Sequence, residues 1–275
     1  MTLLLDGIEV ARGRQTVLAG VTLHVASGET VVLMGRSGIG KTSLLHAAAG
    51  LLPLSAGRIT VNGRLAMVFQ EPRLLGWRSA LDNAAIGLKA LGVPRRERHE
   101  RAETLLREVG FRSGDLDKPP RALSGGMQQR VAIARALAIE PAALLLDEPF
   151  AALDPGLRAE LQHCLRSAVA HRGLATLLVT HDLIEAVRLG GRLVLLAGRP
   201  AIVALEQPLP ALPTGASDAA VFEACAVLLR SPVLAEGLGL LHGRAGEVTT
   251  APRGFPTPPL AGTALSARIA IVHRE

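Results

Sequence analysis

Short apolar runs separated by glycine and charged residues fill the first 70 positions of the chain. The runs "TLLLDGIEV", "VTLHV" and "TVVLM" are rich in β-formers and are bounded by turn residues, so the pattern predicts three strands. The stretch "KTSLLHAAAG" from Lys41 predicts a short helix that ends at Gly50, and "GRITV" and "LAMVF" predict two further strands. The N-terminal part is therefore expected to be mainly β.

The pattern changes twice further along the chain. Residues 80–120 look wholly helical, with breaks at Pro94 and at Pro119–Pro120, and predict a helical subdomain over about 80–138. From position 123 onward helices alternate with apolar strands: helix 125–138, "ALLLD", helix 155–171, "ATLLVT", helix 182–189. Such alternation predicts an α/β fold with a parallel sheet and helical crossovers.

The helix from Pro155 has clear start and stop signals. Asp154 is expected to be its N-cap, Pro155 its first residue, and Gly173 lies just beyond its end. Cys164 falls on its apolar stripe, which predicts a core position.

The composition shifts near residue 206. Proline becomes frequent there, one amphipathic helix stands out at about 218–230, and "TTAPRGFPTPPLAG" is typical of a loosely ordered segment. We expect one domain over 1–206 and a C-terminal extension over 207–275.

Composition and charge narrow the functional classes. The two cysteines have no metal-ligand spacing, which favours a reducing compartment, and no run of about 18 apolar residues exists to span a membrane. Membrane association would then require a partner. The net charge is +6, and basic residues are mixed with acidic ones along the chain. Even in the basic run from Arg95, arginines alternate with glutamates at helical spacing, which favours a solvated helix face over a nucleic-acid surface.

The stretch "GRSGIGKT" fits the phosphate-binding pattern G-x-x-x-x-G-K-[ST], after a predicted strand and before a helix. Its glycines let backbone N–H groups approach phosphate, Lys41 would contact the β- and γ-phosphates, and Thr42 would bind Mg²⁺. The candidate nucleotide-binding residues here are Gly35, Arg36, Ser37, Gly38, Ile39, Gly40, Lys41, Thr42 and Ser43.

Two adjacent carboxylates end the strand "ALLLD". Buried parallel strands deliver functional groups to their carboxyl edge, so Asp147 is expected to hold Mg²⁺ through water and Glu148 to act as general base on the attacking water. A second phosphate-binding helix start occurs in "LSGGMQQR", at Ser124, Gly125 and Gly126.

Taken in order, these motifs resemble the ATPase subunit of ATP-binding cassette (ABC) transporters over about residues 3–206. The shared features are the phosphate loop, Gln70, "LSGGMQQR", "LLLDEP", "ALD" ending at Asp154, and "VTHD" with His181. The resemblance implies a P-loop NTPase core with a mostly parallel sheet, an N-terminal antiparallel β subdomain and an inserted α-helical subdomain.

The resemblance also implies residue roles and partners. Gln70 would contact Mg²⁺ and the attacking water, and His181 would bond the γ-phosphate and support Glu148. Two cassettes would pair head to tail, so that Ser124, Gly125 and Gly126 of one copy meet the ATP held by the phosphate loop of the other; Asp154 belongs to the same nucleotide-binding set.

The segment "VFQEPRLLGWRSALDNAAIGL" is most similar to importers of the nitrate, sulfonate, taurine and thiamine-precursor type. This implies an ATPase on the cytoplasmic face of the membrane, bound to two permease subunits and served by an external solute-binding protein. The aromatic residue that the family sets against adenine is missing from "VARGRQTVL", where Arg12 is the candidate replacement.

Other classes fit less well. A soluble cassette ATPase acting on nucleic acid or ribosomes would favour coiled coils or a second cassette, and the chain shows neither. A P-loop kinase or GTPase would leave "LSGG" unexplained and lacks an N-K-x-D motif, while an inactive module would not need Lys41, Glu148 and His181 together. Trp77, the single tryptophan, is either a core residue beneath the helical subdomain or an anchor for the permease.

Overall fold

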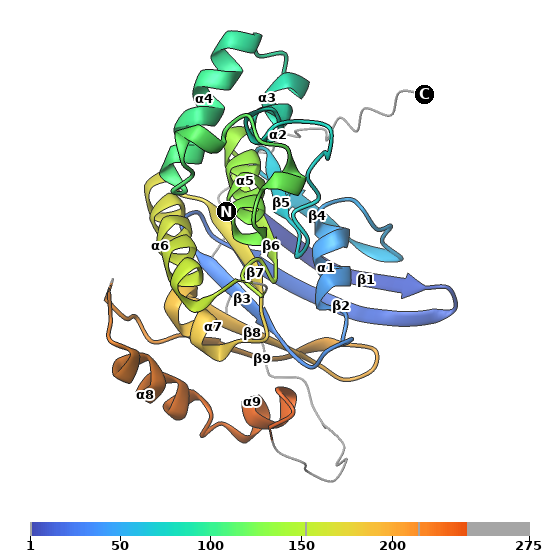
Figure 1. Ribbon diagram of the computed structural model, residues 1–275. Coiled ribbons are helices and arrows are strands. Elements are labelled where there is room, and N and C mark those ends of the chain that lie inside the picture. Colours follow the sequence, from blue (N-terminus) through green and yellow to red (C-terminus); the bar gives the residue numbers. More distant parts are fainter. Residues whose placement is uncertain (1, 152, 214, 241–275) are drawn as a thin grey trace. The chain divides into compact units, whose positions relative to one another are not determined.

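The computed structural model describes residues 2–151, 153–213 and 215–240, and all of them lie in one compact unit. The expected "TTAPRGFPTPPLAG" segment lies outside the described residues. Two sheets organise the described unit (Figure 1). The antiparallel sheet has the order β2-β1-β4, and the larger sheet has the order β5-β6-β7-β3-β8-β9, parallel except for β9.

The strands of the antiparallel sheet are β1 (Leu3–Arg12), β2 (Gln15–Val25) and β4 (Ala56–Val61). Strand β2 begins six residues before the predicted strand "VTLHV", since its first residues pair with the end of β1 as far as Arg12. The β1–β2 ladder shifts register between Leu5 and Ile8, beside Gly7, whose φ is +60°. The Gly7 N–H donates to Thr22 Oγ1 at 2.9 Å and so stays bonded beside the bulge.

The strands of the larger sheet are β3 (Thr30–Met34), β5 (Leu65–Val68), β6 (Ala143–Asp147), β7 (Ala175–Val179), β8 (Arg192–Ala197) and β9 (Ile202–Pro208). Both faces of this sheet are covered. In β3, Val32 and Met34 belong to one hydrophobic cluster while Val31 and Leu33 belong to the other. Burial on both faces explains why these strands are continuous apolar runs rather than alternating ones.

The helices are α1 (Lys41–Ala48), α2 (Ala80–Ala84), α3 (Ile86–Ala90), α4 (Arg95–Glu108), α5 (Gly125–Ala138), α6 (Pro155–Arg172), α7 (Leu183–Leu189), α8 (Asp218–Leu228) and α9 (Pro232–Gly237). Helix α1 packs in the cluster shared with the antiparallel sheet, and α5, α6 and α7 pack on the other face of the larger sheet (Figure 1). None of the described helices combines the length and apolar character needed to cross a bilayer.

Two predictions about helices were wrong in detail. Residues 80–120 are not wholly helical: α4 ends before Gly110, which has φ +74°, and Arg130 Nη1 binds the carbonyls of Val109 and Gly110 at 2.8 and 2.6 Å. Cys164 is only partly buried, because α6 turns Leu161 and Leu165 inward together with Gln162. Its thiol instead lies 3.4 Å from the Glu108 carbonyl oxygen.

Other predictions were confirmed. Asp154 caps α6 by accepting from the Leu157 N–H at 3.0 Å, and Gly173 ends that helix in the left-handed region. Along α4, i,i+4 ion pairs join arginines to glutamates, as expected for a solvated face.

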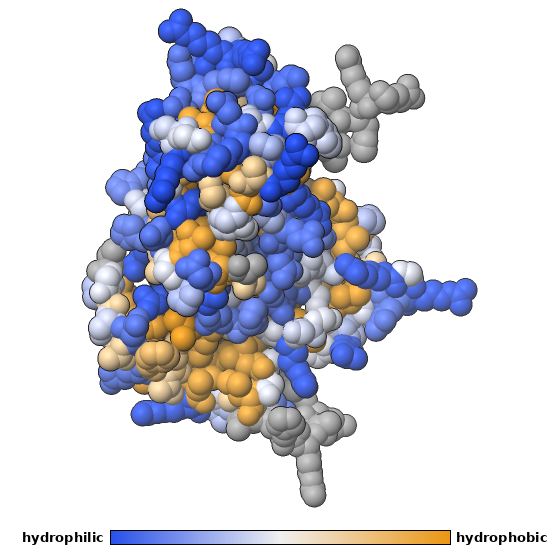
Figure 2. All heavy atoms as spheres, viewed as in Figure 1, coloured by the Kyte–Doolittle hydropathy of each residue, from blue (hydrophilic) through white to orange (hydrophobic). Residues whose placement is uncertain are grey.

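Helix α8 occupies the predicted amphipathic segment, and α9 was missed although Ser231 and Pro232 form a typical helix start. The predicted boundary at residue 206 falls inside β9, which pairs with β8 along the sheet edge. Figure 2 shows apolar side chains gathered over α8 and α9, where Phe222, Val227 and Val233 are exposed.

Candidate functional site

Four neighbouring parallel strands end at the same edge of the larger sheet. The order β5-β6-β7-β3 brings together the segments that follow each strand: Gln70 after β5, Asp147 and Glu148 at the end of β6, His181 after β7, and the glycine loop after β3. These residues are up to 146 positions apart in the sequence. The sheet topology thus assembles most of the predicted site residues along one edge.

The glycine loop is shaped by close backbone approaches. A Cβ on Gly35 would lie 2.6 Å from the Leu196 carbonyl oxygen, and a Cβ on Gly40 would lie 2.9 Å from the side chains of Val17 and Leu18. Both glycines have positive φ, 145° and 114°. A side chain at Gly35 would collide with backbone, and one at Gly40 would be strained by the positive φ and would displace the side chains of Val17 and Leu18.

Lys41 is held inside the loop that it follows. Its ammonium donates to the carbonyls of Gly35 at 2.8 Å and Arg36 at 3.1 Å. Burial lowers the pKa of Lys41, while the charges of Glu148 and Asp147 oppose that shift. A bound phosphate would provide the missing opposite charge, and the side chain is already positioned beside the loop to meet it.

Thr42 and Asp147 lie together although they come from different elements. Thr42 Oγ1 donates to Asp147 Oδ1 at 3.2 Å, joining the start of α1 to the end of β6. Burial raises the pKa of Asp147, and the hydrogen bond from Thr42 acts against that shift. A hydroxyl and a buried carboxylate are hard oxygen ligands, so this pair fits a divalent cation such as Mg²⁺.

Glu148 faces His181 from the adjacent strand. Glu148 Oε2 lies 3.1 Å from His181 Nδ1, and the Glu148 N–H donates to the Val179 carbonyl at 3.0 Å. Glu148 has φ +43°, a left-handed conformation that is uncommon for a residue with a side chain and is typical of functional sites. A cavity of about 40 Å³ beside the two side chains has room for a water molecule.

Gln70 is exposed two residues beyond β5, in a loop that other side chains fix. Arg135 on α5 donates to the carbonyls of Pro72 at 2.7 Å and Arg73 at 2.9 Å. Sequence reasoning missed Arg135, since nothing in its neighbourhood points to a loop over 60 residues earlier. The contact ties the helix that begins at Ser124 to the segment carrying Gln70.

The helix start at Ser124 is built as expected but stands apart from the glycine loop. Ser124 Oγ accepts from the Met127 N–H at 3.3 Å, and Gly125 is exposed with open space around it. Gly126 is buried against Leu157. No hydrogen bond or ion pair within the described residues joins this helix start to Gly35–Thr42. Within one chain the exposed Ser-Gly surface and the glycine loop are therefore separate features.

Trp77 is 80% exposed, so the alternative of a core residue is wrong. Its loop is nevertheless fixed by Asn83, which is fully buried. The Asn83 amide accepts from the Leu75 N–H at 2.7 Å and donates to the carbonyls of Leu75, Arg78 and Ser79. The indole is therefore presented to the surface by a loop with a defined conformation.

Arg12, the candidate adenine contact, is exposed at the end of β1. Among the described residues no group of three or more His, Cys, Asp or Glu side chains forms a metal cage. Mg²⁺ in nucleotide sites is usually held by one or two protein oxygens plus phosphates, so the pair Thr42–Asp147 suffices for such a site.

Comparisons with known proteins agree with this geometry. Residues 18–151 match the family described as ABC transporter. The chain is 45% identical over 190 residues to the aliphatic sulfonates import ATP-binding protein SsuB of Corynebacterium glutamicum, covering 69% of this chain and 78% of the relative. It is 46% identical over 188 residues to the taurine import ATP-binding protein TauB of Rhizobium johnstonii, covering 66% and 71%. A dimeric structure of the cassette MJ0796 bound to ADP and Pi superimposes with a TM-score of 0.69 at 28% identity, covering 76% of this chain and all of the other.

Proposed function

The chain belongs to the ABC transporter family, as an ATP-hydrolysing subunit that energises solute import, and from this premise we propose that it hydrolyses Mg²⁺-bound ATP at a site shared between two copies. The observation that carries the proposal is the sheet order β5-β6-β7-β3, which aligns Gln70, Asp147, Glu148 and His181 with the glycine loop. In the proposal, loop residues Gly35–Ser43 wrap the phosphates and Lys41 moves from its carbonyl partners to the β- and γ-phosphates.

Three residues would hold Mg²⁺: Thr42 directly, Asp147 through water, and Gln70 beside the attacking water. The bound ion would neutralise charge on the β- and γ-phosphates. The hydrogen bond between Thr42 and Asp147 supports this assignment, because it already places both oxygens at one point of the sheet edge.

Glu148 would accept the proton of the attacking water, and His181 would orient Glu148 and bind the γ-phosphate. The 3.1 Å contact between these side chains and the water-sized cavity beside them support the two roles. Hydrolysis breaks the bond between the β,γ-bridging oxygen and the γ-phosphorus, and the bridging oxygen leaves with ADP.

Each active site would be completed by the second copy. Ser124, Gly125 and Gly126 of one chain would meet the γ-phosphate bound by the other, and Asp154, which caps α6 here, would lie at the same interface. The exposed, open surface at Gly125 supports this arrangement, and so does the description of the MJ0796 cassette as a dimer. ATP then joins the two copies, and its hydrolysis releases them.

We further propose that the dimer binds two permease subunits at the cytoplasmic face of the membrane and acts with an external solute-binding protein. The names of the relatives support a small organosulfonate as the class of solute. A nucleic-acid partner is not proposed, because arginines of the basic helix α4 are paired with glutamates.

The sharpest test of the shared site is complementation between two inactive variants. Lys41→Ala removes the loop charge, and Ser124→Arg fills the phosphate-facing helix start, so each variant alone should lose ATP hydrolysis. A mixture should recover about a quarter of wild-type turnover, because half of randomly assorted dimers are mixed and each holds one intact site of two.

Two outcomes would contradict the proposal. Wild-type turnover by Lys41→Ala alone would contradict the role of the glycine loop. A mixture that stays inactive, although cross-linking shows mixed dimers, would contradict two separately competent shared sites. A mixture of Lys41→Ala with Glu148→Gln gives the matched control, because one site of the mixed dimer then lacks Lys41 and the other lacks Glu148.

A further inference from the structure

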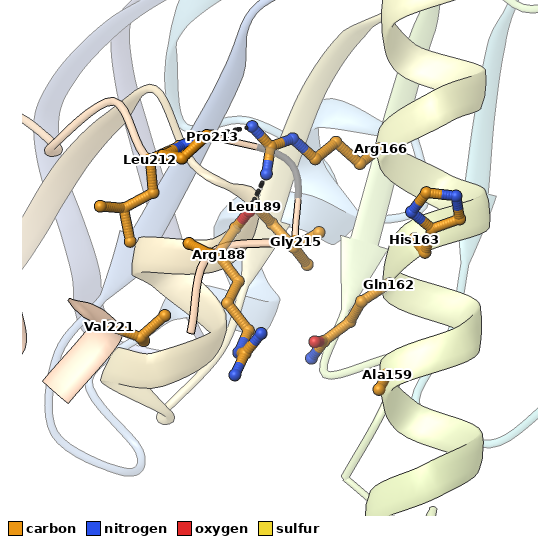
Figure 3. Close-up of a pocket in the computed structure, with 11 residues that line it drawn as sticks. Ala159, Gln162, His163, Arg166, Arg188, Leu189, Leu212, Pro213, Gly215 and Val221 are labelled. Carbon is orange, nitrogen blue, oxygen red and sulfur yellow. Dashed lines mark hydrogen bonds between the residues drawn. The ribbon is translucent and has the colours of Figure 1, made fainter. Parts of the chain in front are cut away.

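A second cavity lies away from the sheet edge that carries the predicted catalytic residues. It has a volume of about 170 Å³ and lies where α6, α7 and α8 meet Leu212, Pro213, Gly215 and Ala216 (Figure 3). Apolar side chains of Leu189, Leu212 and Val221 form part of its wall, and the polar part comes from Gln162, Arg166 and Arg188. Nothing in the proposed ATP chemistry uses these residues.

The first observation that points to a ligand is the unpaired amide of Gln162. The residue is 7% exposed, and its amide makes no hydrogen bond within the described part of the chain. Figure 3 shows its side chain pointing from α6 into the cavity, toward Arg188. The amide opens onto the cavity and has no protein partner among the described residues, so it is available to a polar group of a ligand in the space in front of Gln162.

Positive charge is the second observation. The Arg166 guanidinium donates to the Leu212 carbonyl at 2.8 Å and to the Arg188 carbonyl at 3.5 Å, but none of the described carboxylates lies within 4.0 Å of it. Arg188 pairs with Asp218, whose side chain is 78% exposed and does not line the cavity. No acidic side chain is among the described residues that form the wall. The cavity therefore has an unbalanced positive charge.

We propose that this cavity binds a small aliphatic anion, with a sulfonate or carboxylate group placed between Gln162 and Arg188, while the Arg166 guanidinium adds positive charge at the opposite end of the cavity (Figure 3). Guanidinium groups bind such oxyanions with charge-assisted hydrogen bonds, and the amide of Gln162 adds a neutral donor. The aliphatic part of the ligand packs on Leu189, Leu212 and Val221.

The position of the cavity gives the ligand a structural consequence. Its wall joins α6 and α7, which start directly after Asp154 and Asp182, to the segment that leads into α8. A ligand bound there bridges the C-terminal helices and the helices that follow the ATP-site segments. It stabilises that junction by mass action, independently of nucleotide.

Calorimetric titration of the full chain tests the proposal. Saturating Mg²⁺–ADP keeps the glycine loop occupied, so that anions report only on other sites. Propane-1-sulfonate and butanoate are the probes, inorganic sulfate tests the need for the aliphatic part, and propane-1-sulfonamide tests the need for charge. We expect one site that binds the two organic anions, with sulfate and the sulfonamide at least about tenfold weaker.

Three variants locate the site. Arg166→Gln should weaken binding of the organic anions about threefold or more, because it removes the unpaired positive charge from the cavity wall. Ala159→Phe, at an exposed helix position on the cavity wall, should block binding by filling the space without touching the hydrogen bonds. Arg172→Gln is the matched control, since it removes the same charge from the same helix but does not line the cavity.

The absence of binding, or equal affinities in wild type, Arg166→Gln and Ala159→Phe, would overturn the proposal. Sulfate binding as tight as propane-1-sulfonate would overturn the assignment to an organic anion. If Arg166→Gln does not fold, Ala159→Phe decides the matter alone. ATP hydrolysis is measured separately, so failure here and failure of the shared ATP site are distinguishable.

Discussion

His181 Nδ1 lies 3.1 Å from Glu148 Oε2, across the two neighbouring strands β7 and β6. The side chain of the histidine is 65% exposed while that of the glutamate is 22% exposed, so the pair has one partly buried member and one member open to solvent. This arrangement suits a carboxylate that must stay oriented and accept a proton, and an imidazole that must reach a ligand arriving from outside.

Changing Glu148 to Gln should separate ATP binding from ATP hydrolysis. The substitution keeps the size of the side chain and removes the proton acceptor, so turnover should fall roughly 10²- to 10⁴-fold while ATP affinity is retained. Because hydrolysis no longer releases the two copies, size-exclusion chromatography with Mg²⁺–ATP should show a long-lived dimer. A variant that binds ATP, is concentrated and remains monomeric would contradict ATP-dependent pairing of the free chain.

Asp147→Asn should raise the thermal stability of the chain without nucleotide and abolish the stabilisation that Mg²⁺–ATP gives to the wild type. Burial raises the pKa of Asp147, so the folded chain keeps this proton to a higher pH than the unfolded chain does. The contribution of Asp147 to the free energy of unfolding therefore falls as pH rises from the ordinary value of 3.8 through the raised pKa, and its full cost is reached above that raised pKa.

The measurement is the melting temperature without nucleotide. At pH 7.5, Asp147→Asn should melt higher than wild type, and the difference should shrink as the pH is lowered into the acid range. With Mg²⁺–ATP the order should reverse, because only wild type gains the ligand's stabilisation. A lower melting temperature for the variant at pH 7.5 without nucleotide would show that the Thr42–Asp147 hydrogen bond outweighs the cost of burial.

The two glycines after Ser124 form a matched pair. A Cβ on Gly125 would meet nothing within 4 Å, whereas a Cβ on Gly126 would lie 1.8 Å from Leu157 Cδ2. Gly126→Ala should therefore destabilise the single chain by about 1–3 kcal/mol through overpacking. Gly125→Ala should leave the melting temperature unchanged and lower ATP hydrolysis, since its added methyl meets only the second copy's ligand. Full ATP hydrolysis by Gly125→Ala would argue against a close approach of Gly125 to the ATP bound by the second copy.

Structural features set by residues close in sequence could be predicted from the sequence, whereas those set by contacts between distant segments could not. The glycine loop, the α6 cap at Asp154 and the strand-end carboxylates rest on neighbouring residues, and their local structure was predicted correctly. Arg135 and Asn83 were not predicted as positioning residues, because their partners are carbonyl groups of loops, which leave no mark on side-chain type. Cys164 was misplaced for a related reason. The elements packed against α6 decide which of its side chains are buried. They bury Leu161 and Leu165 and leave Cys164 partly exposed, although the apolar pattern of the sequence fits either arrangement.

Trp77 gives the last prediction, which concerns coupling to the permease. Its indole is 80% exposed on a loop that Asn83 fixes, and the same loop follows Gln70 of the proposed ATP site. A rigidly presented aromatic is an effective anchor, because little conformational entropy is lost when it binds. Trp77→Ala should therefore weaken co-purification with the permease, or the transport that the permease performs, at least about tenfold, while basal ATP hydrolysis changes little.

Phe222→Ala is the matched control for that experiment, since Phe222 is 58% exposed on α8, outside the loop that follows Gln70. It should leave permease binding at the wild-type level. Asn83→Ala provides a second arm: it keeps the indole but removes the hydrogen bonds that hold its loop, so permease binding should weaken although Trp77 is present. Intact permease binding in Trp77→Ala would refute the anchor. Equal weakening by Phe222→Ala would instead show that loss of any exposed aromatic has the same effect.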